Sequence, residues 1–227
     1  MNKFAIIVAG GTGTRMNSVV PKQFLELAGK TVLMHSIQAF YDYDASTQII
    51  VALHPALFTA WKTLCLEYSF SIPHTLAEGG EKRFDSVKNA LSFVTADGIV
   101  AVHDGVRPLL SRGLISRAFD AALLHGNAIP FTPVTDSVRK TEGAANCPVD
   151  RSSLRLIQTP QVFLASQILK AYEQPYRDSF TDDAGVLEAA GGTINLIHGD
   201  PYNIKITYAE DLAIAEALYF FLSRNTS

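Results

Sequence analysis

A glycine-rich segment near the N-terminus is the first stretch whose residue types could carry chemistry. The apolar run Phe4–Val8 is followed by AGGTGTRM, residues 9–16, and two cations, Arg15 and Lys22, lie in or shortly after it. Glycines after a strand let the backbone approach a ligand closely, and exposed amides there can bind phosphate oxygens. An Arg fork and a compact Lys charge suit the negative charge that builds up at a reacting phosphorus. The segment therefore favours a polyphosphate site.

This segment could also be a plain turn or a different kind of nucleotide-binding loop. The glycines alone are equally typical of a tight turn from a strand into a loop. A Walker loop is excluded because GxxxxGK[ST] is absent, and a dinucleotide fingerprint is excluded because Met16 stands where GxGxxG needs its last glycine. The apolar context VVPKQF favours a functional Lys22 over a solvated surface lysine.

Two later segments also combine glycine with charged residues. EGGEKRFDS, residues 78–86, leads into a helical pattern, and HDGVRP, residues 103–108, ends a strand-like run. A carboxylate at the end of a strand, such as Asp104, can bind sugar hydroxyls or Mg²⁺, but it can also be a turn residue. His103 is interpreted as structural, and Ser86 alone would be an ordinary residue of a first helical turn.

The elements that must position these residues alternate along the chain. Strands are predicted at 4–9, 47–54, 74–80, 98–108, 127–134, 193–199 and 203–207, and helices at 31–43, 55–70, 83–94, 111–126, 181–191 and from Ala209 onward. This order predicts an α/β fold with a mostly parallel twisted sheet covered on both faces. Ligands bind beyond the carboxyl ends of such strands, so the three glycine segments should meet at one rim.

The alternation breaks between Val134 and Phe163. Two extended stretches flank the turn sequence TEGAAN, which predicts a protruding β-hairpin arm at about 134–163. Cys147-Pro148 indicates an edge or exposed position. A long two-stranded ribbon is marginal alone in water, so the arm is expected to need a partner surface.

Composition limits the function classes. The chain has 227 residues, 48% hydrophobic content, a net charge of −3 and a pI near 6.1, so one domain spanning 1–227 is expected and a basic nucleic-acid-binding face is not. Cys65 and Cys147 form neither a CxxC pair nor a disulfide framework. No stretch has the pattern of a secretory signal or membrane span. A cytoplasmic protein without membrane association is expected.

The motifs together resemble one known family. AGGTGTRM, PKQF, GGEKRFDSV, HDGVRP, PVDR, QTPQVF, TDDA and NIKIT are similar, in order and over nearly the whole chain, to the 2-C-methyl-D-erythritol 4-phosphate cytidylyltransferases. The resemblance implies a Rossmann-like nucleotidyltransferase fold, a homodimer in which the β-arm crosses to the neighbouring subunit, and dependence on Mg²⁺ or another divalent cation. Two departures are mild: Gly105-Val106 replaces two alanines, and Ser137 replaces a threonine.

The resemblance also implies roles for individual residues. Arg15 and Lys22 would be catalytic. The CTP-binding residues would be Ala9, Gly10, Gly11, Thr12, Gly13, Gly79, Gly80, Arg83, Ser86 and Asp104, of which Gly79, Gly80, Arg83 and Ser86 match the segment that holds the cytosine and its ribose. The sugar phosphate would be held by Asp104, Arg107, Ser137, Arg151, Thr159, Thr181, Asp182 and Lys205, with Arg151 reaching across the dimer. The metal would be held mainly by the CTP phosphates, with Asp104 as a candidate ligand.

The reaction implied is transfer of CMP from CTP to methylerythritol phosphate. The attacking phosphate oxygen is already an anion, so no general base is needed, and catalysis consists of bringing two anions together and neutralising the transition state. Two alternatives stand beside it: the same chemistry on ribitol 5-phosphate, and a non-catalytic nucleotide-binding module. The PVDR segment and the serine after RFD favour methylerythritol phosphate over ribitol phosphate.

Overall fold

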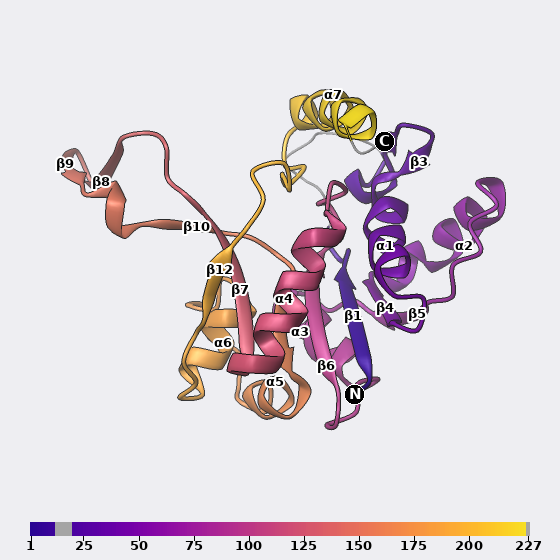
Figure 1. The fold of residues 1–227 in the computed structure, drawn as a ribbon, viewed down its shortest axis with the longest axis horizontal. Helices are drawn as coiled ribbons and strands as arrows, with labels where there is room; N and C mark the ends of the chain where they lie inside the picture. The colour runs from indigo at the N-terminus through magenta and orange to yellow at the C-terminus, as the bar shows by residue number, and fades with distance from the viewer. Residues whose placement is uncertain (12–19, 226–227) are drawn as a thin grey trace.

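The central sheet forms the frame of the molecule (Figure 1). The computed structural model describes residues 1–11 and 20–225. Seven strands follow the order β10-β7-β11-β6-β1-β4-β5, and β12 pairs with β7. Pairing is parallel from β6 through β1 and β4 to β5, whereas β11 runs antiparallel to both β6 and β7. The strands are β1 (Lys3–Val8), β4 (Gln48–Leu53), β5 (Thr75–Glu78), β6 (Ile99–Asp104), β7 (Asn127–Pro133), β10 (Arg155–Ile157), β11 (Gln161–Leu164) and β12 (Leu196–His198).

Helices cover both faces of this sheet. Alternate residues of β1 point to opposite sides: Ala5 and Ile7 pack with the α1, α2 and α4 side, and Phe4 and Ile6 with the α3, α5 and α6 side. The apolar run of β1 is therefore buried on both faces, as expected for a parallel strand. The helices are α1 (Val32–Tyr43), α2 (Phe58–Glu67), α3 (Arg83–Leu91), α4 (Arg112–His125), α5 (Ala165–Ala171), α6 (Asp183–Ala189) and α7 (Ala209–Asn225).

Local signals explain where the helices begin and end. The Thr31 side chain accepts a hydrogen bond from the Met34 amide at the start of α1, and Ser111 does the same for Leu114 in α4. Gly126 closes α4 with φ of 91°, a left-handed conformation that glycine adopts without strain, as the sequence predicts. Pro55 lies in the 3-10 turn η3 (Pro55–Leu57) that precedes α2, so the predicted helix at 55–70 is shorter than expected.

One predicted strand is wrong. Residues 203–207 form no strand, although Ile206 donates one backbone hydrogen bond to Val106 O at 2.9 Å. The alternating apolar residues pack instead into a cluster of Leu27, Val32, Val106, Leu109, Ile206 and Ala215, which also anchors α7. The periodicity therefore reflects packing under α7 and not pairing in a sheet. Leu27 ends β2 (Glu26–Leu27) and Val32 directly follows β3 (Lys30–Thr31), and these two strands form a short hairpin.

The arm leaves the body as a narrow ribbon (Figure 1). β8 (Val138–Glu142) pairs only with β9 (Ala145–Val149) in the described part of the chain, and Gly143 at the tip has φ of 59°. The paired ribbon is shorter than the 134–163 segment of the prediction, because β10 and β11 return to the sheet. Cys147 is exposed on the ribbon, as Cys147-Pro148 indicates.

No helix in residues 1–11 and 20–225 is both long and apolar enough to cross a bilayer.

Candidate functional site

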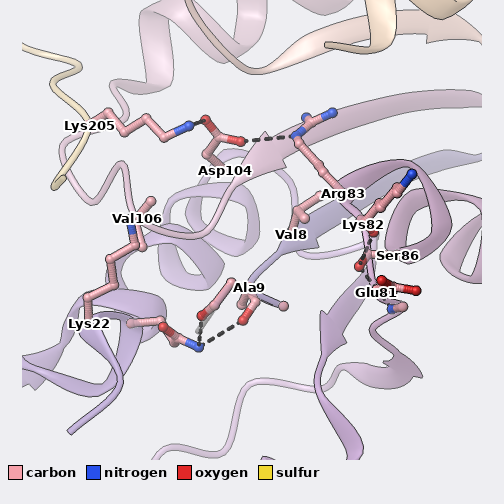
Figure 2. A pocket seen from close by; sticks show the side chains of 14 residues that line it. Val8, Ala9, Lys22, Glu81, Lys82, Arg83, Ser86, Asp104, Val106 and Lys205 are labelled. Atoms are coloured by element: carbon pink, nitrogen blue, oxygen red, sulfur yellow. Dashed lines mark hydrogen bonds and ion pairs between the residues drawn. The ribbon is translucent and has the colours of Figure 1, made fainter. Parts of the chain in front are cut away.

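A first cavity lies beyond the carboxyl ends of β1 and β6 (Figure 2). In Figure 1, β1 points toward the end of the molecule that carries α7. The three glycine segments meet at this cavity, as predicted, because the parallel strands that precede them end on the same side of the sheet. Residues of these segments line the cavity together with residues from β1, from η2 and from the stretch before α7. The full lining is Val8, Ala9, Gly10, Gly11, Lys22, Gln23, Gly80, Glu81, Lys82, Arg83, Ser86, Asp104, Val106 and Lys205.

The start of the glycine segment is held by a buried glutamine. Gln23 Nε2 donates hydrogen bonds to Ala9 O at 2.8 Å and Gly11 O at 3.3 Å, and Ala9 N donates to Ala52 O at 2.8 Å. Sequence reasoning missed Gln23, although a polar residue between Lys22 and the buried Phe24 is a signal of such a role. Thr12, Gly13 and Arg15 lie outside the described residues.

Lys22 reaches the cavity from η2 (Lys22–Phe24), which begins after Pro21. Its ammonium group donates to Ile206 O at 3.2 Å. Figure 2 shows Lys22 on the side of the cavity opposite Arg83. The structure thus brings the predicted catalytic lysine to the cavity that the glycines line.

The EGG turn approaches the sheet too closely for a larger residue. A Cβ at Gly79 would lie 3.0 Å from the Leu53 carbonyl carbon and 3.1 Å from His54 N, which is tighter than ordinary packing. The Ser86 hydroxyl accepts from Gly80 N at 3.0 Å and donates to Lys82 O at 3.1 Å. Ser86 therefore holds the turn at the cavity wall, and Gly80 lines the cavity itself.

Asp104 forms the centre of an ionic cluster at the end of β6. Lys205 Nζ lies 2.9 Å from its Oδ2, Arg107 Nε 3.5 Å from Oδ2, and Arg83 Nε 3.5 Å from Oδ1. Burial alone would raise the pKa of this carboxyl, but the charges of Arg83, Lys205 and Arg107 together hold the pKa well below its usual range. Asp104 is thus a fixed anion among cations.

The guanidinium of Arg83 is shared between two carboxylates. Nη1 and Nη2 donate to Asp183 Oδ1 and Oδ2 at 2.9 and 2.7 Å, while Nε faces Asp104. The resemblance places Arg83 with the cytosine and ribose, but its polar edges are engaged with these acids. Asp183, fully buried at the start of α6, is a second residue that sequence reasoning missed.

A second cavity adjoins the first. The two share Arg83, Asp104 and Lys205 as a common wall. The second cavity also brings together the residues predicted to hold the sugar phosphate, except those on the arm, and is lined by Arg83, Asp104, Arg107, Ile157, Gln158, Thr159, Gln161, Thr181, Asp182 and Lys205. Gln161 was missed; its Nε2 donates to Asp182 Oδ2 at 2.7 Å and orients that acid.

Thr159 and His103 form a buried chain behind the second cavity. The Arg107 carbonyl oxygen can only accept, so His103 Nε2–H donates to it at 3.2 Å, and Nδ1 of the neutral imidazole accepts from the Thr159 hydroxyl at 3.1 Å. The Thr159 oxygen also accepts from Asp104 N at 3.0 Å. Burial lowers the pKa of His103 to about 4, which keeps the imidazole neutral near pH 7. These bonds fit the structural role expected for His103.

Two predicted residues lie away from both cavities. Ser137 and Arg151 are exposed on the segments that flank the ribbon, and the Arg151 guanidinium donates to Thr135 O. Neither residue lines either cavity of its own chain. The arm that carries them projects away from the body of the molecule (Figure 1).

The acidic side chains near the two cavities limit how a divalent metal could be held. Within residues 1–11 and 20–225, no group of three or more His, Cys, Asp or Glu side chains converges on a common point. The Asp104 carboxylate is neutralised by its cations, which makes it a weak ligand. This chemistry fits Mg²⁺ bound mainly through substrate phosphates and waters, a usual mode for this ion.

The sequence is similar to a well-represented family. The family model described as 2-C-methyl-D-erythritol 4-phosphate cytidylyltransferase (IspD) matches residues 4–220. A relative of that name from Phocaeicola vulgatus is 47% identical over 218 residues, which cover 96% of this chain and 100% of the relative. A relative of the same name from Geobacillus kaustophilus is 37% identical over 221 residues, covering 96% and 97% of the two chains.

Solved structures of enzymes with this name are also similar to this chain. The 2-C-methyl-D-erythritol 4-phosphate cytidylyltransferase of Thermus thermophilus superposes with a TM-score of 0.78 at 32% identity, over 96% of this chain and 98% of that one. The enzyme of the same name from Francisella tularensis superposes with a TM-score of 0.81 at 30% identity, over 96% and 99%.

Proposed function

The chain belongs to the 2-C-methyl-D-erythritol 4-phosphate cytidylyltransferase family, and from this premise we propose how its two cavities share the reaction. The enzyme transfers CMP from CTP to 2-C-methyl-D-erythritol 4-phosphate in isoprenoid precursor synthesis, releasing pyrophosphate. The resemblance drawn from the motifs and the Rossmann-like fold are confirmed. The names of the relatives favour methylerythritol phosphate over ribitol 5-phosphate, and they set aside the non-catalytic module.

The first cavity binds CTP and the second binds methylerythritol phosphate. The observation that carries this division is the common wall of Arg83, Asp104 and Lys205, because the α-phosphate of one substrate and the phosphate of the other must meet between them. The glycine segment and Lys22 lie on the CTP side, and Arg107, Thr159, Thr181 and Asp182 on the sugar side.

The chemistry needs approach and charge neutralisation. A phosphate oxygen of methylerythritol phosphate attacks the α-phosphorus of CTP, a P–O bond forms, and the bond to the bridging oxygen breaks with pyrophosphate as leaving group. Lys22 and Arg15 stabilise the charge on the non-bridging oxygens, and the cationic cluster around Asp104 offsets the repulsion between the substrates. The nucleophile is an anion, so no side chain needs to remove a proton.

A divalent cation, Mg²⁺ by preference, would be held mainly by the CTP phosphates, with Asp104, which lines the first cavity, as a candidate carboxylate ligand. When bound, the ion neutralises phosphate charge. The protein's own contribution is the glycine backbone at Ala9, Gly10 and Gly11, which lines the first cavity beside the phosphates that would carry the metal.

The active enzyme is a cytoplasmic homodimer that does not bind nucleic acid. The 227 residues form one domain, and the arm carries Ser137 and Arg151 to the sugar-phosphate cavity of the partner. Their distance from the cavities of their own chain and the ribbon's lack of pairing beyond β8 and β9 in the described residues support this arrangement.

The test is incubation with CTP, Mg²⁺ and each candidate sugar phosphate, followed by pyrophosphate release. Methylerythritol phosphate should support release at a rate far above that with ribitol 5-phosphate. Equal or faster release with ribitol 5-phosphate would contradict the assignment of the second cavity.

A further inference from the structure

Asp183 is a buried acid with no role in the reaction described so far. It is fully buried, and both of its carboxylate oxygens are engaged. Arg83 Nη1 and Tyr172 Oη–H donate to Oδ1 at 2.9 and 2.6 Å, and Arg83 Nη2 donates to Oδ2 at 2.7 Å. A bidentate pair of this kind fixes the plane of the guanidinium as well as its position.

The aromatic residues around Asp183 make this arrangement rigid. Tyr172 stacks on Phe84 with ring centroids 4.7 Å apart, and Phe84 also stacks on Phe180 at 5.7 Å. Burial, together with the charge of Asp183, raises the pKa of Tyr172 well above its ordinary value, so its hydroxyl remains a donor. Phe84 directly follows Arg83, so the backbone and the guanidinium of Arg83 are held by the same group of residues.

The fixed arginine belongs to the wall between the two cavities. With Nη1 and Nη2 engaged by Asp183, only its Nε edge faces Asp104 Oδ1, at 3.5 Å. Asp104 Oδ2 is left to Lys205 at 2.9 Å and Arg107 at 3.5 Å. An unrestrained Arg83 could turn its fork to both oxygens of Asp104, or grip a substrate phosphate, since Arg favours such bidentate contacts.

We propose that Asp183, supported by Tyr172, is a positioning residue for cytidylyl transfer that acts by holding Arg83 between the two substrates. The proposal rests on the division of the cavities given above. Asp183 touches neither cavity, so it acts through Arg83 and the ionic cluster. The three cations and two carboxylates of that cluster leave one net positive charge, and Asp183→Asn leaves two. Both the orientation and the charge of the wall would change.

The primary measurement is kcat/KM for each substrate in Asp183→Asn. We expect a loss of about tenfold or more for both substrates, because Arg83 lines both cavities and small displacements of reacting groups are costly. Asp44→Asn is the matched control, since it removes a carboxylate that pairs with Lys3 at 2.8 Å outside both cavities. It should leave kcat/KM within about twofold of the wild type.

A double-mutant cycle separates positioning from a purely structural role. If Asp183 acts through Arg83, Asp183→Asn should add little to the loss in Arg83→Gln, and the double variant should be no worse than the poorer single one. If the loss in kcat/KM of the double variant were the product of the two single losses, the proposal would be overturned. An Asp183→Asn enzyme with a lowered Tm but an unchanged kcat/KM per folded molecule would also overturn it.

Tyr172→Phe, which removes one hydroxyl, should fold even if Asp183→Asn does not. It should show a smaller loss for both substrates, and a normal kcat/KM in Tyr172→Phe would also count against the proposal.

Different results would contradict the division of the cavities and the role of Asp183. A wild-type enzyme that releases no pyrophosphate from CTP and methylerythritol phosphate would contradict the proposed division of the cavities. A fully active wild type with an equally active Asp183→Asn variant would contradict only the role of Asp183.

Discussion

Lys205 Nζ lies 2.9 Å from Asp104 Oδ2, and both residues line both cavities. The lysine comes from the segment before α7 and the aspartate from the end of β6, so the pair joins distant parts of the chain at the point between the substrates (Figure 2). Asp104 fixes the ammonium group without removing its charge. A cation held in this way can meet a phosphate without first being ordered.

Lys205→Ala should raise the KM for methylerythritol phosphate more than the KM for CTP. The lysine is expected to contact the sugar phosphate, and its loss leaves Asp104 with less neutralisation beside an anionic substrate. Steady-state kinetics with each substrate varied in turn provide the measurement. Lys62→Ala, at an exposed lysine of α2, is the control. Unchanged KM values for both substrates would remove Lys205 from the site.

Lys22→Ala should lower turnover by roughly 10²-fold or more with little change in Tm, as for loss of other preorganised charge donors. The ammonium group reaches the first cavity, and the side chain lies outside the buried core, so the fold should survive. Arg15→Lys should also be damaging, because a point charge cannot reproduce the fork. Lys30→Ala, whose amine donates to Gln38 outside both cavities, serves as control. Near-normal turnover in Lys22→Ala or in Arg15→Lys would show that the substituted residue does not act in catalysis.

CTP should be used far better than UTP, ATP or GTP. The Gly79–Gly80 turn lies against the backbone of Leu53 and is held by Ser86, so the wall expected to meet the base is fixed and close. A purine should not fit such a wall. Pyrophosphate release at equal nucleotide concentrations measures this preference, and comparable rates with ATP would show that the base lies elsewhere.

Arg151→Ala should raise the KM for methylerythritol phosphate much more than that for CTP. Arg151 is exposed on the arm and lines neither cavity of its own chain. We therefore expect it to contact the phosphate of methylerythritol phosphate bound in the partner subunit. Arg139→Ala, at an exposed arginine of β8, is the matched control and should leave both KM values unchanged.

Mixing two impaired chains, at a methylerythritol phosphate concentration too low for the Arg151→Ala homodimer to be active, tests the shared site directly. A dimer of one Lys22→Ala chain and one Arg151→Ala chain has one site with both changes and one with neither, so activity should return after subunit exchange. Lys22→Ala mixed with itself provides the baseline. Persistent inactivity in proven heterodimers would mean that Arg151 acts within its own chain.

Acid should weaken the fold partly through Asp104. Its pKa is depressed in the folded state, so its contribution to stability is fully present above the unfolded pKa of about 3.9 and is lost progressively as the pH falls from there through the lower pKa of the folded state. Asp104→Asn should therefore be less stable than the wild type at pH 7, and the difference should shrink by pH 3. Urea unfolding at both pH values gives the comparison, with Asp120→Asn as an exposed control on α4. A difference that is the same at both pH values would contradict this account.

The local patterns of the sequence determined the frame and the family. The buried run at β1, the cap at Ser111 and the stop at Gly126 are short-range signals, and each depends on residues a few positions apart. The convergence of the glycine segments also followed, because parallel strands end on one side of a sheet. The residues predicted for the sugar phosphate therefore line one cavity, apart from those on the arm.

Only the tertiary structure decided which polar groups satisfy one another. Arg83 could be assigned to a ligand from its motif, but its partner Asp183 comes from α6, and no local pattern records that pairing. Sequence patterns also did not show that the Gln23 side chain would donate a hydrogen bond to Ala9 O in the glycine segment. Nor did they show that the alternating apolar residues of 203–207 would pack under α7 and not pair in the sheet. A buried charge is stable only when it is paired, and its partner can come from any segment that the fold brings near it. Sequence periodicity reports local structure and does not indicate which distant segment supplies that partner.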